Sequence, residues 1–117
     1  MSVLQTKYFP TVEAIKTAAE KLKGIAAVSP LEEHSRFSEK YNCKILFKRE
    51  DLQQVRSYKI RGAYNKISSL DPEETKNGII CASAGNHAQG VALSCRLLKI
   101  KGKILCQLQH QIKRWSK

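Results

Sequence analysis

The sequence predicts an α/β fold, and the evidence for it lies in the C-terminal half of the chain. A short apolar run at residues 79–82 is followed by a polar turn at residues 83–87. From Ala88, apolar residues recur with helical spacing until Lys101-Gly102, and a second apolar run begins at Lys103. Strand, turn, helix and strand in this order form a βαβ unit. With 117 residues, the chain can form one domain at most.

The N-terminal part is expected to be mainly helical. Thr11 suits a helix N-cap, and an apolar stripe with a spacing of three and four follows it: Val12, Ile15, Ala18, Ala19, Leu22 and Ile25. Ser29-Pro30 breaks this helix, because the residue before a proline is pushed to extended geometry. A short helix is predicted at residues 33–41 and a short strand at residues 43–48. The strand ends in Lys48-Arg49-Glu50-Asp51, which is too polar to continue in a core.

The middle of the chain predicts a helix that Ser57 can cap. Its inner face would carry Ile60, Ala63, Tyr64 and Ile67. A brief helical turn is expected from Asp71 to Glu74, closed near Asn77-Gly78. The apolar run at residues 79–82 has the length and flanking turns of a fully buried parallel strand.

The net charge of +11 is spread unevenly. All 10 acidic residues lie at or before Glu74, so residues 75–117 carry +8 and no acid. An acid-free basic segment is typical of nucleic-acid or membrane surfaces, and a non-enzymatic basic binding module is therefore one alternative. Trp115 is the only aromatic residue of the last 13, and no nucleic-acid motif is present. We expect no nucleic-acid partner and no membrane association. Because no signal peptide or membrane-length apolar run is present, we expect a cytoplasmic protein.

The four cysteines are far apart and show no metal-ligand spacing, so no metal site is predicted. Cys43, Cys81 and Cys106 lie in apolar runs, where a free thiol behaves as a small hydrophobic group.

Two segments could carry chemistry. Ser57-Tyr58-Lys59-Ile60-Arg61-Gly62 places a lysine in the first turn of a helix, where the positive end of the helix dipole favours the neutral amine. A neutral lysine can act as a Schiff-base nucleophile. The alternative is a solvated surface lysine, which is the commoner state of this residue type.

The second segment is the turn Ser83-Ala84-Gly85-Asn86-His87 between a strand and a helix. Backbone N–H groups at a helix N-terminus attract anions, and Gly85 allows a ligand to approach the backbone closely. Ligands of open α/β sheets bind outside the carboxyl ends of the strands, where this turn lies. Asn86 offers an amide to a hydroxyl or phenolate group. His87 could be a base, but physics alone favours a helix-capping role for it.

Both segments strongly resemble threonine dehydratases, also called threonine ammonia-lyases. The resemblance rests on residues 48–65, which contain Lys59, and on residues 82–92, which contain the glycine turn; it extends over about residues 10–104. It implies a pyridoxal-phosphate enzyme of fold type II, the fold shared with the tryptophan synthase β subunit and serine racemase. The fold class expected is thus the N-terminal part of that α/β fold, an incomplete parallel sheet flanked by helices.

The resemblance also implies the roles of individual residues. Lys59 would hold pyridoxal 5'-phosphate as a Schiff base and move protons on the substrate. Tyr58, where phenylalanine is commoner in the family, would lie near the cofactor ring. Asn86 would donate a hydrogen bond to the pyridoxal phenolate oxygen. The turn of Ser83, Ala84, Gly85, Asn86 and His87 would hold the substrate carboxylate.

The implied reaction converts L-threonine, and less readily L-serine, to a 2-oxo acid and ammonia; from threonine the product is 2-oxobutanoate, the first step of isoleucine biosynthesis. The segment Lys48-Arg49-Glu50-Asp51 is closer to the biosynthetic than to the catabolic branch. The alternative within the same fold is a serine racemase or L-serine dehydratase. Full-length relatives are homo-oligomers, so the same is expected here.

The resemblance stops short of the family's second half. Residues 1–104 correspond to the N-terminal part of the catalytic domain, whereas residues 105–117 match nothing in the family. Codons for residues 105–115 can be chosen so that a shifted frame reads a family-like segment, and we hypothesise a frameshift just after Ile104. The family's Gly-rich phosphate loop is missing, so we expect little or no activity from this chain alone.

Overall fold

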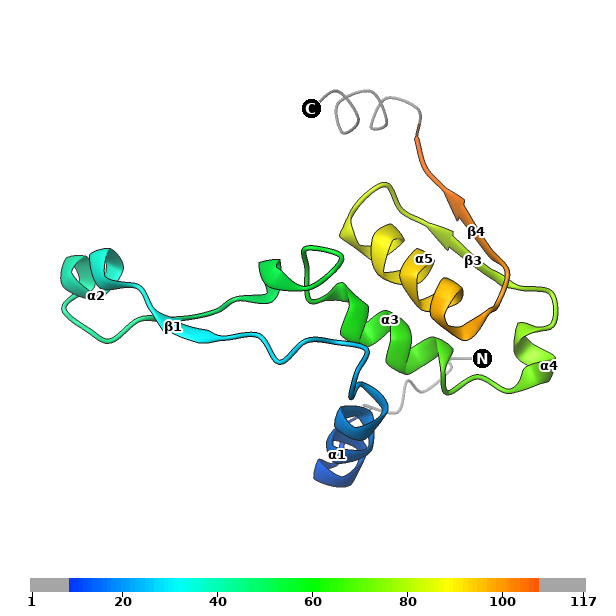
Figure 1. Cartoon of the computed structure of the whole chain (residues 1–117), viewed down its shortest axis with the longest axis horizontal. Coiled ribbons are helices and arrows are strands. Elements are labelled where there is room, and N and C mark those ends of the chain that lie inside the picture. Colours follow the sequence, from blue (N-terminus) through cyan, green and yellow to red (C-terminus); the bar gives the residue numbers. More distant parts are fainter. Residues whose placement is uncertain (1–8, 108–117) are drawn as a thin grey trace, which may run out of the picture.

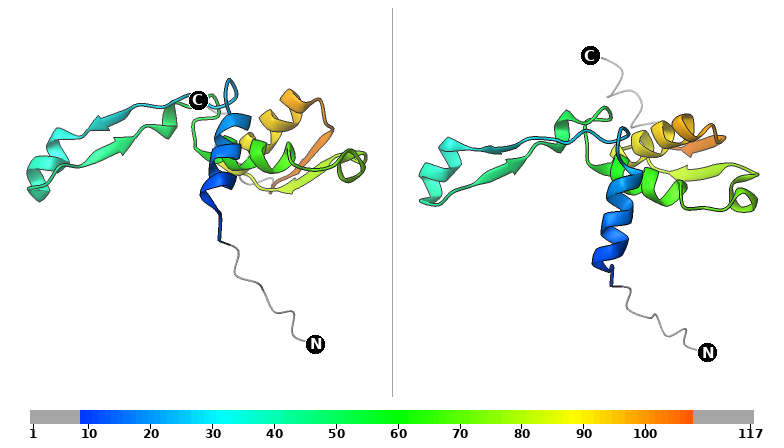
Figure 2. Two further views of the ribbon diagram at one scale, coloured as in Figure 1. Left: turned by 90° about the horizontal axis from the view of Figure 1, so that it is seen from below. Right: turned by 60° about the horizontal axis from the view of Figure 1, so that its bottom comes forward.

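A computed structural model describes residues 9–107 of the chain. Figure 1 shows a body made of β3, β4, α5 and α3, from which a long arm carrying β1 and α2 extends. Helix α1, Val12–Lys21, leaves the body in a different direction, as both views of Figure 2 show. The functional residues predicted above all belong to the body.

The body contains the expected βαβ unit. Strands β3, Ile79–Ala82, and β4, Gly102–Leu105, pair in parallel, with Ile79 opposite Gly102. Helix α5, Asn86–Leu98, connects them, and α3, Lys59–Ile67, packs against α5. The buried core lies between these elements and consists of Ala63, Ile67, Cys81, Val91 and Cys95. The predicted α/β class is therefore correct.

The arm is an antiparallel pair with a helix at its tip. Strands β1, Leu31–Glu33, and β2, Leu46–Lys48, pair with Leu31 opposite Lys48. Helix α2, Ser35–Tyr41, lies between them and ends at Asn42, whose φ of 49° is left-handed. Three rings hold the tip together: His34 stacks on Phe37 at 4.4 Å between centroids, and Phe47 lies 4.6 Å from His34.

Two short helical segments complete the chain. The 3-10 helix η1, Glu50–Leu52, joins the arm to the body. Helix α4, Pro72–Thr75, begins with a capping box in which Asp71 and Glu74 bond reciprocally to backbone N–H groups. Gly78 follows it with a φ of 87°, and an added Cβ would lie 2.6 Å from the Lys101 carbonyl oxygen, so this turn requires glycine.

Several predicted boundaries were wrong because tertiary pairing decides them. The strand expected at residues 43–48 starts at Leu46, and the helix expected at residues 33–41 starts at Ser35 because Glu33 pairs with Leu46. The first helix ends at Lys21 and not near Ile25. Tyr58 is the N-cap of α3 in place of Ser57, although the Ser57 hydroxyl still accepts a 3.4 Å hydrogen bond from the Lys59 N–H.

The prediction of a fully buried strand at residues 79–82 was also wrong. Only Cys81 is buried in β3, and Ile80 is 70% exposed. Within residues 9–107, the sheet of β3 and β4 has only these two strands. Helix α5 covers one face of this sheet, and side chains on the other face, such as Ile80, remain open to solvent. Among these described residues, no helix is long and apolar enough to cross a membrane.

The cysteines divide differently from the expectation. Cys81 and Cys95 are buried in the core, whereas Cys43 and Cys106 are exposed. Burial raises the pKa of the Cys95 thiol, and the neighbouring Cys81 adds to that effect. The core position of Cys95 comes from helical spacing on α5, which places it against Gly102.

We therefore predict that the four thiols react at two distinct rates. In the folded chain, Cys43 and Cys106 should be alkylated by iodoacetamide while Cys81 and Cys95 react only after denaturation, because the attacking thiolate must be accessible. Peptide mass spectrometry at successive times measures the four rates. Equal rates for all four would contradict the packing of α5 on the sheet.

Candidate functional site

Lys59 is the first residue of α3 and so lies in the first helical turn, where the sequence predicted it. Its side chain is half-buried, and its Nζ lies 5.2 Å from the centroid of the Tyr58 ring. A cation at this distance is attracted to the face of an aromatic ring. Tyr58 therefore restricts where the Lys59 amine lies.

A cavity of about 580 Å³ opens beside this lysine. Lys59 and Tyr58 line it from the start of α3, Ala82 from the end of β3, and His87 from the first turn of α5. Apolar side chains such as Ile67 and Val91 form its inner wall. Cavities of 300–1,000 Å³ with apolar walls and few polar groups are typical of small-molecule sites.

The glycine turn lies next to this cavity. Ser83 and Ala84 line a second hollow of about 450 Å³ with Leu105, and Ala82 borders both spaces. The Gly85 N–H donates a 3.2 Å hydrogen bond to the Ser83 hydroxyl, which fixes the turn. The structure thus brings Tyr58, Lys59 and His87 to one cavity and two of the turn residues to its neighbour.

The last two predicted residues lie at the start of α5. Gly85 is the N-cap and Asn86 the first helical residue, and neither lines the two cavities. Gly85 has a φ of −112°, and an added Cβ would meet nothing closer than the Ser83 Oγ at 4.0 Å. This backbone conformation is open to any residue type, so glycine is not required for steric reasons. The absence of a Cβ leaves free space in front of the N-terminus of α5. An anionic group could approach that N-terminus closely.

Sequence reasoning missed the contact that sets the distance between α3 and α5. A Cβ on Gly90 would lie 3.0 Å from the carbonyl oxygen of Lys59 and 3.1 Å from its carbonyl carbon. Helix α5 therefore lies directly against the peptide group of the candidate lysine. The spacing of glycines in the motif was the available signal, but only the position of α3 shows what Gly90 faces.

It also missed the polar network that holds the other side of α3. The Glu50 carboxylate accepts two 2.8 Å hydrogen bonds from Arg61, at Nε and Nη2, and further ones from Ser29 and Gln53. Gln53 is 1% exposed, and its side-chain amide bonds to both the N–H and the carbonyl of Ala27. This network ties residues 27–29, η1 and α3 together. From the sequence, Glu50 was interpreted as part of a polar strand end and of a family-like segment, with no predicted partner.

Two pKa shifts report the strength of this network. The Arg61 guanidinium donates to Glu50 from Nε and Nη2, and this lowers the pKa of the Glu50 carboxyl group from 4.5 to about 2. The bond to Glu50 likewise raises the pKa of Arg61. The Glu50 side chain is 16% exposed and that of Arg61 is 35% exposed, so water screens the pair in part.

Residues 9–107 contain no group of three or more histidine, cysteine or acidic side chains that could hold a metal ion. The polar groups that line the cavity beside the candidate lysine include Lys66 and His87. A lysine near a helix N-terminus, at the carboxyl end of a parallel strand, is an arrangement with which an α/β protein can bind a small anionic ligand next to an amine.

Comparison with known families identifies the family to which this α/β protein belongs. The family model described as pyridoxal-phosphate dependent enzyme matches residues 22–112, and the chain belongs to this family. The expected fold class is confirmed by this match and by the solved structures that resemble the chain.

Curated relatives carry the resemblance to threonine dehydratases. The chain is 55% identical over 93 residues to the biosynthetic L-threonine dehydratase of Bacillus subtilis, a match that covers 80% of the chain and 22% of that protein. It is 54% identical over 90 residues to the enzyme of the same name from Staphylococcus epidermidis, a match that covers 77% of this chain and 21% of that protein. The chain thus spans about a fifth of the length of these relatives.

Solved structures agree on the fold. Maize serine racemase superimposes with a TM-score of 0.81 at 29% identity, covering 91% of this chain and 33% of that one. The processed form of threonine deaminase isoform 2 from Solanum lycopersicum gives a TM-score of 0.71 at 35% identity. This match covers 92% of this chain and 35% of that one. The arm and the body of the chain therefore both lie within the area of resemblance.

The residues present fit the cofactor of this family. Pyridoxal phosphate carries an aldehyde, which needs a primary amine, and Lys59 presents one at the cavity. The cavity volume of about 580 Å³ suits a ring of that size. The open space beside Gly85 suits an anionic group at the start of α5.

The Gly90 contact yields a prediction with an internal control. Gly90→Ala should destabilise the chain by about 1–3 kcal/mol, because the new methyl group overlaps the Lys59 peptide. Gly62→Ala should be neutral or stabilise it by up to about 1 kcal/mol, since Gly62 has nothing within 4 Å and alanine favours the helix. Urea unfolding followed by circular dichroism measures both. Equal effects of the two changes would contradict the close approach.

The Glu50 network predicts acid sensitivity. The pKa of Glu50 is about 2 in the folded chain and 4.5 without its partners, so its contribution is complete above pH 4.5 and disappears as the pH falls toward 2. That contribution is about 2–3 kcal/mol. Arg49 also lowers the pKa of exposed Asp51, which adds a smaller effect of the same sign. Urea unfolding at pH 6 and pH 3 measures the loss, which Glu50→Gln should greatly reduce. An unchanged loss in that variant would contradict the assignment to Glu50.

Proposed function

We propose that this chain provides the cofactor lysine and the carboxylate-binding turn of a threonine dehydratase, which deaminates L-threonine to 2-oxobutanoate and ammonia. The identity of 55% over 93 residues with a biosynthetic L-threonine dehydratase is the observation that carries the proposal. The proposal also includes cytoplasmic location, homo-oligomeric assembly and a place in isoleucine biosynthesis, of which the last is supported by the biosynthetic role in the relatives' names.

Lys59 is proposed as the catalytic residue. The cofactor, when bound, would supply an electron sink for the pair left when the substrate loses its α-hydrogen. Lys59 Nζ would first hold the cofactor and then, released, accept the α-proton. The half-buried position of this side chain and its place at the cavity beside His87 suit a group that holds the cofactor and then receives a proton.

The remaining predicted residues are proposed to bind and orient. Tyr58 would lie against the cofactor ring, and Asn86 would bond to the phenolate oxygen. Ser83, Ala84, Gly85, Asn86 and His87 would hold the substrate carboxylate at the N-terminus of α5. The open space beside Gly85 and the placement of His87 at the Lys59 cavity support these assignments.

The cavity has one open side, which we propose the rest of the catalytic domain covers. Tyr58 is 59% exposed and Ile80 70% exposed, so part of the cavity's lining is open to solvent. Excluding water there requires further chain, and we expect little turnover from the 117 residues alone. Residues 1–104 would be the N-terminal part of that domain.

The last 13 residues are proposed to come from a shifted reading frame, although the family model extends to residue 112 and so overlaps this segment. Residues 105–107 lie in and just after β4, and residues 108–117 lie outside the described part of the chain. Sequencing the coding DNA beyond Ile104 tests the proposal. A shifted frame should continue with a family-like sequence, and a frame that reads nothing similar would refute the idea.

A second candidate is a serine racemase or L-serine dehydratase of the same fold. Its support is the superposition on maize serine racemase, with a TM-score of 0.81. Both candidates use the same lysine and the same turn, so the substrate distinguishes them and the site residues do not.

A chimera tests the function directly. Residues 22–104 would replace the matching segment of the Bacillus subtilis relative, and 2-oxobutanoate formation from L-threonine would be measured alongside pyruvate and D-serine formation from L-serine. We expect threonine turnover that falls by roughly 100-fold or more in Lys59→Ala, because a positioned base contributes about that much.

Lys101→Ala is the matched control, since Lys101 is an exposed lysine away from both cavities. It should keep the activity of the unaltered chimera. A folded chimera that binds the cofactor and converts serine but not threonine would favour the second candidate. Full activity in Lys59→Ala would refute the proposal for this residue.

A further inference from the structure

The direction in which Lys59 points depends on how α3 is turned about its axis. Successive residues of an α-helix are rotated by about 100°, so Lys59 and Arg61, two positions apart, leave the helix on nearly opposite sides. Lys59 faces the cavity, and Arg61 faces Glu50 and the carbonyl of Ala27. Whatever fixes Arg61 therefore also fixes the direction of Lys59.

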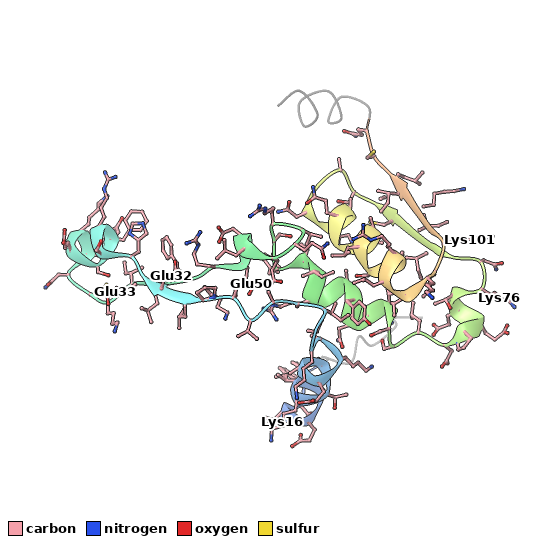
Figure 3. The ribbon with its side chains drawn as sticks, viewed as in Figure 1. Lys16, Glu32, Glu33, Glu50, Lys76 and Lys101 are labelled. Carbon is pink, nitrogen blue, oxygen red and sulfur yellow. The ribbon has the colours of Figure 1, made fainter. Side chains whose placement is uncertain are left out.

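Glu50 is well placed to do this. It lies where the arm joins the body, close to the start of α3, as Figure 3 shows. Its carboxylate bonds to Nε and Nη2 of Arg61 at 2.8 Å each, and a two-point contact sets an orientation as well as a distance. Its other partners, Ser29 and Gln53, are 4% and 1% exposed, so the carboxylate is itself held in place.

We propose that Glu50 is a positioning residue for Lys59: through Arg61 it sets the rotation of the first turn of α3 and so aims the lysine into the cavity. The inference rests on the proposed function for the use made of Lys59, but the positioning itself concerns this chain alone. The neighbouring Asp51 makes no such contact, because its carboxylate pairs with Arg49, which bonds also to Glu32 in the arm.

The first test measures the lysine without any cofactor. The 117-residue chain is treated briefly with acetic anhydride, and peptide mass spectrometry gives the acetylation of Lys59 relative to exposed Lys101. In the unaltered chain we expect Lys59 to react more slowly, because its side chain is half-buried and lies over the Tyr58 ring. Glu50→Gln should raise this ratio several-fold, whereas Asp51→Asn should leave it unchanged.

Two further measurements separate positioning from a general loss of structure. Iodoacetamide protection of Cys95, a buried core residue, must persist in Glu50→Gln. The double change Glu50→Arg with Arg61→Glu exchanges the two charges and should return the ratio toward that of the unaltered chain. An unchanged ratio in Glu50→Gln, or a change accompanied by exposure of Cys95, would overturn the inference.

A second arm distinguishes failure of this inference from failure of the proposed function. The chimera of residues 22–104 with the rest of the Bacillus subtilis relative is mixed with pyridoxal 5'-phosphate and reduced with borohydride, which traps even short-lived adducts, and the modified lysines are identified. Selective trapping at Lys59 that falls by about tenfold in Glu50→Gln supports both, since small misplacements of reacting groups cost up to about 100-fold. The expected acetylation changes without selective trapping at Lys59 would support the positioning and refute the cofactor role.

Discussion

The rest of the structure depends on the close approach of α5 to α3 at Gly90. With no side chain at this position, the two helices meet at the peptide group of Lys59, and a Cβ would come within 3.0 Å of its carbonyl oxygen. This contact places the start of α3 beside the end of β3 and the first turn of α5. The cavity that receives Lys59 and His87 exists because these three element ends converge.

The core behind that contact is small and one-sided. It is formed by α3, α5 and the inward residues of β3 and β4. Ser94 of α5 is also buried, and its hydroxyl is satisfied because it donates a 2.7 Å hydrogen bond to the Gly90 carbonyl oxygen. The outer face of the sheet carries exposed apolar residues such as Ile80. Surface of this kind normally marks an interface, which agrees with a chain that spans about a fifth of its curated relatives.

Sequence patterns predicted what depends on local periodicity. The βαβ unit and the buried residues Ile60, Ala63 and Ile67 of α3 follow from apolar spacing along one segment. Tyr64, expected on the same inner face, is only partly buried. What the patterns could not predict depends on distant partners. Gln53 is a polar residue that expectation places at the surface, yet it is buried because it bonds to Ala27, 26 residues earlier.

The candidate site shows the same division. Its residues were predictable from two motifs, because each motif places its own side chains at a helix start. Which residues share a cavity was not predictable. Tyr58, Lys59 and His87 line one cavity and Ser83 and Ala84 the adjoining one, whereas Gly85 and Asn86 line neither. The supporting contacts of Gly90 and Glu50 join elements that are distant in the sequence, so neither motif reveals them.

Two constraints of different physical kind therefore act on one lysine. The Gly90 contact is steric and independent of pH, whereas the Glu50–Arg61 pair depends on an ionised carboxylate whose pKa is about 2. Packing fixes how close α3 lies to α5, and the ion pair fixes how α3 is turned. Because a helix can rotate by some degrees without leaving its neighbour, the electrostatic contact controls the aim of the amine. Acid should thus disturb the direction of Lys59 before it disturbs the core.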